Sequence, residues 1–222
     1  MITLSSRLNF ADATMGELQR LAETCQPATF GLDQKDVLDE TYRKAGKLDI
    51  DDFALKLDPV RVGILDAVHS ELAIDRLVRE DAIRAELYKL NVYGMSRAID
   101  SDSIGRSGTD TAVVGPGSFF KPHVDTPRSE LQFGSLVIVL PTAHEGGALK
   151  IRYAEEDSEA NSKEKREEWT FDSSALLATC TQPTIAYVAF FSDIEHEVMS
   201  VTSGYRVTIT YNLYWAHSKG DS

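Results

Sequence analysis

The sequence predicts a mainly β protein with flanking α-helices, whose strands form a sandwich or barrel. Helix signals fill the first eighty residues, and short apolar runs of strand length fill most of the remainder. Turn residues separate these runs, as they do in all-β domains. The length of 222 residues allows one domain with a sizeable core, or at most two small ones.

Three helices are expected before the first strand. Residues 14–17 read Thr-Met-Gly-Glu, the form of a capping box, and apolar residues at helical spacing follow them. Residues 37–46 fit a second helix that ends at a glycine. An Asp-Pro pair, typical of an N-cap and first helical position, opens a third apolar run over 58–74. Residues 1–82 are therefore expected to form a helical region that packs on the rest.

The remaining chain, residues 83–216, is expected to form one β domain. Residues 133–140 contain a continuous apolar run, typical of a strand buried on both faces. Residues 155–168 are polar without a core pattern, so they predict a surface loop, and 217–222 form a tail. The expected strands are 85–93, 133–140, 147–153, 169–171, 185–191, 196–201 and 205–215.

The last strand has one polar face and one apolar face. The apolar face can pack under the N-terminal helices, which leaves the polar face toward an interior. An arginine in an interior needs an anion, and a carboxylate matches its planar fork. A structural ion pair with one of the many acids is the competing interpretation. The polar face consists of Arg206, Thr208, Thr210 and Asn212.

Two histidines and one carboxylate form a candidate metal site. His123 and Asp125 are two residues apart, so in an extended segment they point to the same face. His196 lies far downstream, ten residues before Arg206. This ligand set is the facial triad of non-haem Fe(II) oxygenases, although a short His-x-Asp pattern also arises by chance. The chain has only five histidines, so few other combinations exist.

Charge and composition exclude several classes of protein. With 23 basic and 35 acidic residues the net charge is −12, which disfavours a general nucleic-acid binder. No apolar run of about 18 residues predicts a membrane span, and no signal peptide is visible. Two cysteines, Cys25 and Cys180, suit a reducing compartment. A cytoplasmic or nuclear protein is expected, and its oligomeric state is left open.

The stretch from Leu87 to Tyr214 resembles the iron- and 2-oxoglutarate-dependent dioxygenases, in their prolyl 4-hydroxylase-like branch. The matching pieces are Tyr93-Gly94, Phe120 to Asp125, Gly146 to Leu149, His196, and Gly204 to Thr208. The resemblance implies a double-stranded β-helix of the jelly-roll or cupin kind, with N-terminal helices that buttress one sheet. It also implies that His123, Asp125 and His196 hold catalytic Fe(II).

The same resemblance assigns the cosubstrate residues. Arg206 would bind the distal carboxylate of 2-oxoglutarate, Thr208 would add a hydroxyl partner, and Tyr93 would line the pocket. Some relatives carry a second tyrosine on the strand after His-x-Asp, but residues 136–140 contain none. O2 is the other cosubstrate, and ascorbate is a candidate addition.

The implied reaction hydroxylates a C–H bond and releases succinate and CO2. A peptidyl proline or similar group is the expected substrate, while a free amino acid or another small molecule stays open. Residues 126–128 follow the metal ligands and either meet the substrate or form a simple turn. Two other functions compete: a non-catalytic double-stranded β-helix that binds a partner, and a zinc-dependent hydrolase with the same ligands.

Residues 95–114 depart most from the family. They separate Tyr93-Gly94 from Pro116-Gly117, are polar, and show little periodicity, which predicts a disordered loop. The segment is either a real insertion, such as a lid, or a translated intron. The intron is favoured, because codons for residues 94–96 and 114–115 can encode an intron start and end in frame.

Overall fold

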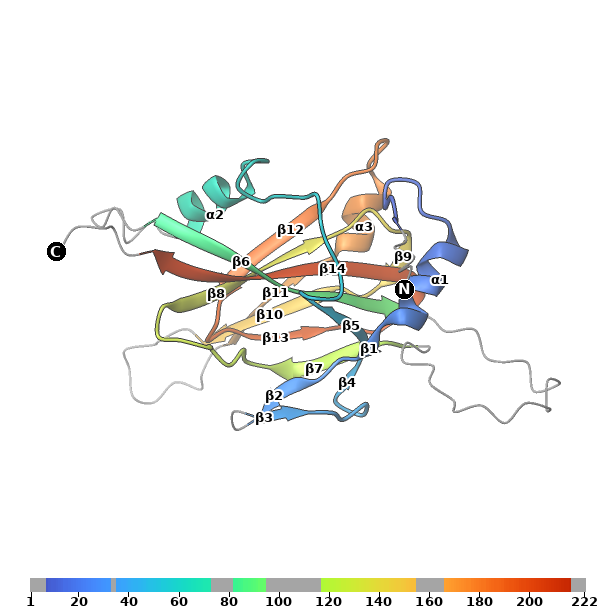
Figure 1. Ribbon diagram of the computed structural model, residues 1–222. Coiled ribbons are helices and arrows are strands. Elements are labelled where there is room, and N and C mark those ends of the chain that lie inside the picture. The colour runs from blue at the N-terminus through green and yellow to red at the C-terminus, as the bar shows by residue number, and fades with distance from the viewer. Residues whose placement is uncertain (1–6, 33–34, 73–81, 95–116, 155–165, 217–222) are drawn as a thin grey trace, which may run out of the picture.

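Two antiparallel sheets face each other in the computed structural model, and helices flank them (Figure 1). The structure describes residues 7–32, 35–72, 82–94, 117–154 and 166–216. The expected insertion at 95–114, the tail at 217–222 and most of the 155–168 loop lie outside these residues. None of the helices in the described part of the chain is long and apolar enough to span a membrane.

The strands form a larger sheet, a smaller sheet and a separate hairpin. The larger sheet has the order β1 (Gln26–Pro27), β5 (Gly46–Asp49), β6 (Ala82–Gly94), β14 (Val201–Ala216), β8 (Gln132–Val139) and β12 (Ala186–Phe191), and β9 (His144–Gly146) pairs with β14. The smaller sheet has the order β11 (Arg166–Phe171), β10 (Leu149–Ala154), β13 (Glu195–Val198), β7 (Phe119–His123) and β4 (Arg43–Lys44). The hairpin joins β2 (Phe30–Leu32) to β3 (Lys35–Val37).

The chain passes back and forth between the two sheets. Strands β6, β8, β12 and β14 belong to the larger sheet, while β7, β10, β11 and β13 belong to the smaller one. Eight antiparallel strands divided in this way make a double-sheet jelly roll. The expected double-stranded β-helix is therefore confirmed.

The first predicted helix is α1 (Met15–Thr24), and its capping box is present. The Thr14 hydroxyl accepts the Glu17 backbone N–H at 3.3 Å, and the Thr14 N–H donates to the Glu17 carboxylate at 2.9 Å. Two further helices are α2 (Ile64–Leu72) and α3 (Ser173–Ala178). The short helix α3, which is capped by Asp172, was not predicted from the sequence.

Two of the predicted N-terminal helices need correction. No helix covers 37–46, because this stretch instead contributes β4 and the start of β5, and strand pairing with β7 and β6 outweighs its weak helical pattern. The third helix starts at Ile64 and not at Pro59. Asp58 caps a turn by accepting the Val60 N–H at 3.0 Å, and Gly63, at φ 76°, separates that turn from α2. In addition, residues 166–168 of the expected polar loop belong to β11.

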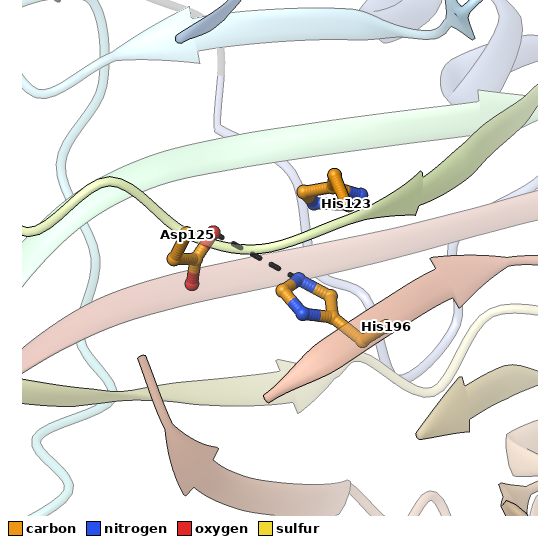
Figure 2. Close-up of side chains that lie close together, drawn as sticks. All are labelled: His123, Asp125 and His196. Carbon is orange, nitrogen blue, oxygen red and sulfur yellow. Dashed lines mark ion pairs between the residues drawn. The ribbon is translucent and has the colours of Figure 1, made fainter. Parts of the chain in front are cut away.

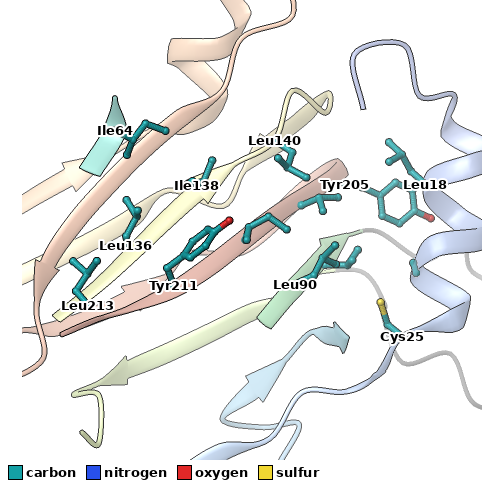
Figure 3. Close-up of a cluster of buried hydrophobic side chains, with 14 of the residues drawn as sticks. Leu18, Cys25, Ile64, Leu90, Leu136, Ile138, Leu140, Tyr205, Tyr211 and Leu213 are labelled. Carbon is teal, nitrogen blue, oxygen red and sulfur yellow. The ribbon is translucent and has the colours of Figure 1, made fainter. Parts of the chain in front are cut away.

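The apolar face of β14 packs under α1 and α2, as its alternation predicted (Figure 3). Leu18 of α1 and Ile64 of α2 join one buried cluster with Val207, Ile209 and Leu213 of β14. A second cluster lies between the two sheets and includes Phe120, Val188 and Phe190. The helices thus hold the larger sheet from outside, and its inner face is free to line a site.

Candidate functional site

The structure brings the three predicted metal ligands together. His123 ends β7, Asp125 follows two residues later, and His196 lies on the neighbouring strand β13, directly opposite His123 in the register (Figure 2). Their ligand atoms all lie within 4.8 Å of one another. Atoms that bind one ion at about 2.1 Å lie at most about 4.2 Å apart. Small side-chain movements would therefore bring the three ligand atoms within binding distance of one ion.

Each side chain of the triad is oriented by a hydrogen bond. The Nδ1 atoms of His123 and His196 lie 2.8 and 3.0 Å from the carbonyl oxygens of Lys121 and Ile194. A carbonyl only accepts, so each Nδ1 carries the proton and each Nε2 lone pair is available to a metal. The Ser135 hydroxyl donates to Asp125 Oδ2 at 2.6 Å, which leaves Oδ1 on the side of His196.

Burial keeps His123 neutral. Desolvation, followed by the nearness of His196, lowers the pKa of His123 to about 2. Phe120 stacks on the His123 ring at 3.5 Å between centroids, and Phe190 lies 4.6 Å from the His196 ring. Since a metal binds the neutral imidazole, His123 is ready to coordinate without first losing a proton.

Replacing Ser135 with alanine is expected to weaken metal binding about 10- to 100-fold, because Asp125 loses the hydrogen bond that orients its carboxylate. Metal titration would measure the change. Ser174→Ala is a matched control, since its hydroxyl bonds to Asp172 outside the site. Equal metal affinity of the Ser135 variant and the wild type would contradict an orienting role.

A cavity of about 1130 Å³ contains the triad and the polar face of β14. Arg206, Thr208, Thr210 and Asn212 all line it, as the predicted interior face required. The Arg206 side chain is only 1% exposed, and its Nε and Nη2 atoms have no hydrogen-bond partner in the described part of the chain. Burial lowers the pKa of Arg206 to about 10, which still leaves it charged at neutral pH. A buried, unpartnered guanidinium in a cavity indicates a site for an anion.

The other two predicted cosubstrate residues border Arg206. Tyr93 lies opposite Arg206 in the register of β6 and β14, with its ring 5.6 Å from the guanidinium carbon. Thr208 is one inward-facing position further along β14 and is 1% exposed. Both line the cavity, so the structure groups all six predicted site residues in one space.

Because Gly147 has no side chain, the Arg206 side chain can pack against its backbone. It adopts φ 71°, and a Cβ there would lie 2.8 Å from both Arg206 Cδ and Val201 Cγ2. Gly147→Ala is therefore expected to displace Arg206 and to destabilise the fold by about 1–3 kcal/mol beyond the cost of positive φ. Gly63→Ala is the control, because Gly63 has a similar φ of 76° and open space around its Cβ position. Equal melting temperatures and 2-oxoglutarate affinities of the two variants would refute the contact.

His144 lies apart from the metal ligands and is not part of the cluster that they form. It belongs to β9, and its ring nitrogens bond to the Thr142 carbonyl at 2.8 Å and the Ser173 hydroxyl at 3.2 Å. Sequence reasoning missed Ser135 and Gly147. Gly147 lay within a recognised family motif, whereas no local pattern marks Ser135 as the partner of a carboxylate ten residues away.

A family model described as the 2OG-Fe(II) oxygenase superfamily matches residues 109–214. This range contains the whole triad, Arg206 and Thr208. The matched residues therefore form a 2OG-Fe(II) oxygenase domain, and enzymes with this domain use Fe(II), 2-oxoglutarate and O2. A search of curated proteins finds no significant match.

Three solved structures illustrate what the chain is similar to. A Pseudomonas putida prolyl-4-hydroxylase is 15% identical over 93% of this chain and 89% of that chain, with a TM-score of 0.40. A 2OG-Fe(II) oxygenase family oxidoreductase from Burkholderia pseudomallei is 13% identical over 92% and 82%, with a TM-score of 0.42. A viral collagen prolyl hydroxylase from Paramecium bursaria Chlorella virus-1, in complex with 2OG, is 13% identical over 92% of each chain, with a TM-score of 0.38.

Proposed function

We propose that this oxygenase hydroxylates a C–H bond of a peptidyl proline or a similar group. One observation carries the assignment of the site. The Arg206 guanidinium, whose Nε and Nη2 atoms have no hydrogen-bond partner among the described residues, lines the same cavity as a cluster of two histidines and a carboxylate. An anion that also binds the metal would satisfy both features, and 2-oxoglutarate has a carboxylate at each end.

In this proposal some residues bind the metal and others bind the cosubstrate. His123, Asp125 and His196 hold Fe(II), and the hydrogen bonds from Ser135 and to the two carbonyls fix their orientation. Arg206 anchors the distal carboxylate of 2-oxoglutarate. Thr208 adds a hydroxyl beside that carboxylate, and Tyr93 closes the pocket wall. Iron, 2-oxoglutarate and O2 together supply the oxidising chemistry, with succinate and CO2 as products.

An aromatic wall supports a proline-like substrate. Phe30, Tyr42 and Phe120 line the cavity beside His123, with ring centroids 4.5 Å apart for the first pair and 6.0 Å for the second. The Tyr42 hydroxyl donates to the Pro122 carbonyl at 2.7 Å, which holds this wall against the strand that carries His123. Aromatic faces suit an apolar ring, and the cavity is larger than the five-carbon cosubstrate needs.

Succinate formation tests the proposal. The full chain, supplied with Fe(II), 2-oxoglutarate and O2, is expected to produce succinate, and proline-containing peptides are expected to raise the rate and gain one oxygen atom. The same protein loaded with Zn(II) should produce none, because zinc has no redox chemistry. Absence of succinate with Fe(II) bound would favour a non-catalytic binding module. Succinate without any oxidised peptide would keep the oxygenase and refute proline as the substrate.

A further inference from the structure

A β-bulge in β6 turns two consecutive side chains into the cavity. The register with β14 shifts between Thr210, which pairs with Lys89, and Tyr211, which pairs with Leu87, so Tyr88 is the extra residue. Before the bulge Ile83, Ala85 and Leu87 pack toward the helices, and after it Leu90 and Val92 do. The change of alternation leaves Tyr88 and Lys89 both lining the cavity. Bulges commonly re-aim side chains in this way beside active sites.

Lys89 is a buried cation that has no ion-pair partner among the residues that the structure describes. It is only 6% exposed, and its ammonium lies 4.4 Å from the centre of the Tyr88 ring. Asp49 faces it across the register of β5 and β6, but Asp49 is paired with Lys47 at 2.7 Å. Within the described residues no carboxylate lies within ion-pair distance of Lys89. A buried charge is costly unless it is paired, so its position favours an anionic ligand.

Arg128 brings a second positive charge to the same ring. Its guanidinium carbon lies 4.5 Å from the centre of Tyr88, and it donates to the Tyr88 hydroxyl at 2.7 Å. The Arg128 backbone N–H donates to Gln132 at 2.8 Å, which fixes the loop that follows the metal ligands. Arg128 also has no ion-pair partner in the described part of the chain. Two cations therefore contact one phenol at the cavity wall of a protein whose net charge is −12.

This positive subsite is separate from the predicted cosubstrate anchor. Lys89 comes four residues before Tyr93 along β6, and Tyr93 pairs with Arg206 on β14. The backbone positions of Lys89 and Arg206 are therefore separated by roughly 13 Å along the strand direction. Asp36 and Asp39 also line the cavity, but both are exposed and neither is within ion-pair distance of Lys89 or Arg128. Charge at this wall is therefore available to a second ligand.

We propose that the substrate of this oxygenase carries a carboxylate, which binds between Lys89 and Arg128 beside the Tyr88 ring. This inference rests on the proposed function, because it assigns the second ligand of the cavity as the substrate. The buried ammonium supplies the stronger contact and the exposed guanidinium the weaker one. A substrate with an acidic side chain next to its reacting residue meets this requirement.

A matched pair of probes tests the subsite. The full chain is loaded with Fe(II) and saturating 2-oxoglutarate under argon, so that Arg206 and the metal are already occupied. An acetylated, amidated proline–glutamate dipeptide and its proline–glutamine counterpart are then titrated calorimetrically. The glutamate probe is expected to bind about tenfold more tightly, as one charge-assisted contact in a partly dry site allows.

Three variants locate the preference. Lys89→Met keeps the unbranched stem but removes the charge, and is expected to reduce the preference to within about twofold. Arg128→Gln, at an exposed position, should reduce it less. Lys150→Met is the control with the same change in net charge, because Lys150 pairs with Glu168 on β11 and does not line the cavity. Thermal melting checks that the variants are folded.

The outcomes are distinct from those of the succinate assay. Equal binding of the two probes by the wild type, including no measurable binding of either, would overturn the subsite. A preference that survives in both Lys89→Met and Arg128→Gln would overturn it as well. The titration needs no turnover, so a chain that prefers the glutamate probe but makes no succinate would count against the hydroxylase alone.

Discussion

Replacing His196 with alanine is expected to abolish stoichiometric Fe(II) binding. The variant would retain His123 and Asp125, which keep the hydrogen bonds that orient them. The metal site would nevertheless lack its third protein ligand. His123→Ala and Asp125→Ala should have the same effect, because each removes one of three protein ligands. Anaerobic titration of the purified chain with Fe(II) measures the result.

Two other histidines provide the controls for this experiment. His69 lies on α2, and His144 bonds to Thr142 and Ser173, so alanine at either position should leave Fe(II) binding intact. Full Fe(II) binding by the His196 variant would disprove the assignment. Loss of binding in the His144 variant would show instead that the metal centre extends toward β9.

Substituting Arg206 with alanine is expected to leave Fe(II) bound and to weaken 2-oxoglutarate strongly. A buried carboxylate that loses its charge-assisted partner costs about 2–5 kcal/mol, or roughly one and a half to three and a half decades in affinity. Arg206→Lys should be milder, because it keeps the charge and loses only the planar fork. Titration of the iron-loaded protein with 2-oxoglutarate under argon measures both.

A second arginine serves as the matched control. Arg152 pairs with Glu168 and Glu195 and does not line the cavity, so Arg152→Ala should leave 2-oxoglutarate binding unchanged. Wild-type affinity in the Arg206 variant would mean that Arg206 is a structural residue. Its unpartnered nitrogens would then require another anion.

Alternation along single strands made much of the fold and the site predictable. In β14 the period of two correctly assigned Val207 to the helix-covered face and Arg206 to the interior. The same period placed His123 and Asp125 together. These inferences needed only the local backbone, because side chains two residues apart in a strand share a face whatever the strand pairs with.

The missed features depend on contacts between distant parts of the chain. Residues 43–49 carry little strand pattern of their own and become strands by pairing with β6 and β7. Ser135 reaches Asp125 only because the fold brings β8 and the segment after β7 to the same cavity. The bulge at Tyr88 is visible in the sequence as one signal. The apolar positions switch from odd to even residue numbers between Leu87 and Leu90.

The short strands before residue 50 also protect the open sides of the sheets. β5 covers one edge of β6, and β4 covers the edge of β7 next to the metal ligands (Figure 1). A fragment that starts at residue 83 would present both edges with unpaired backbone N–H and C=O groups, which invite other chains to add strands. We therefore predict that the oxygenase domain cannot be separated from the rest of the chain at the end of the predicted N-terminal region. Shortened versions intended for expression should keep residues 26–49 to avoid aggregation.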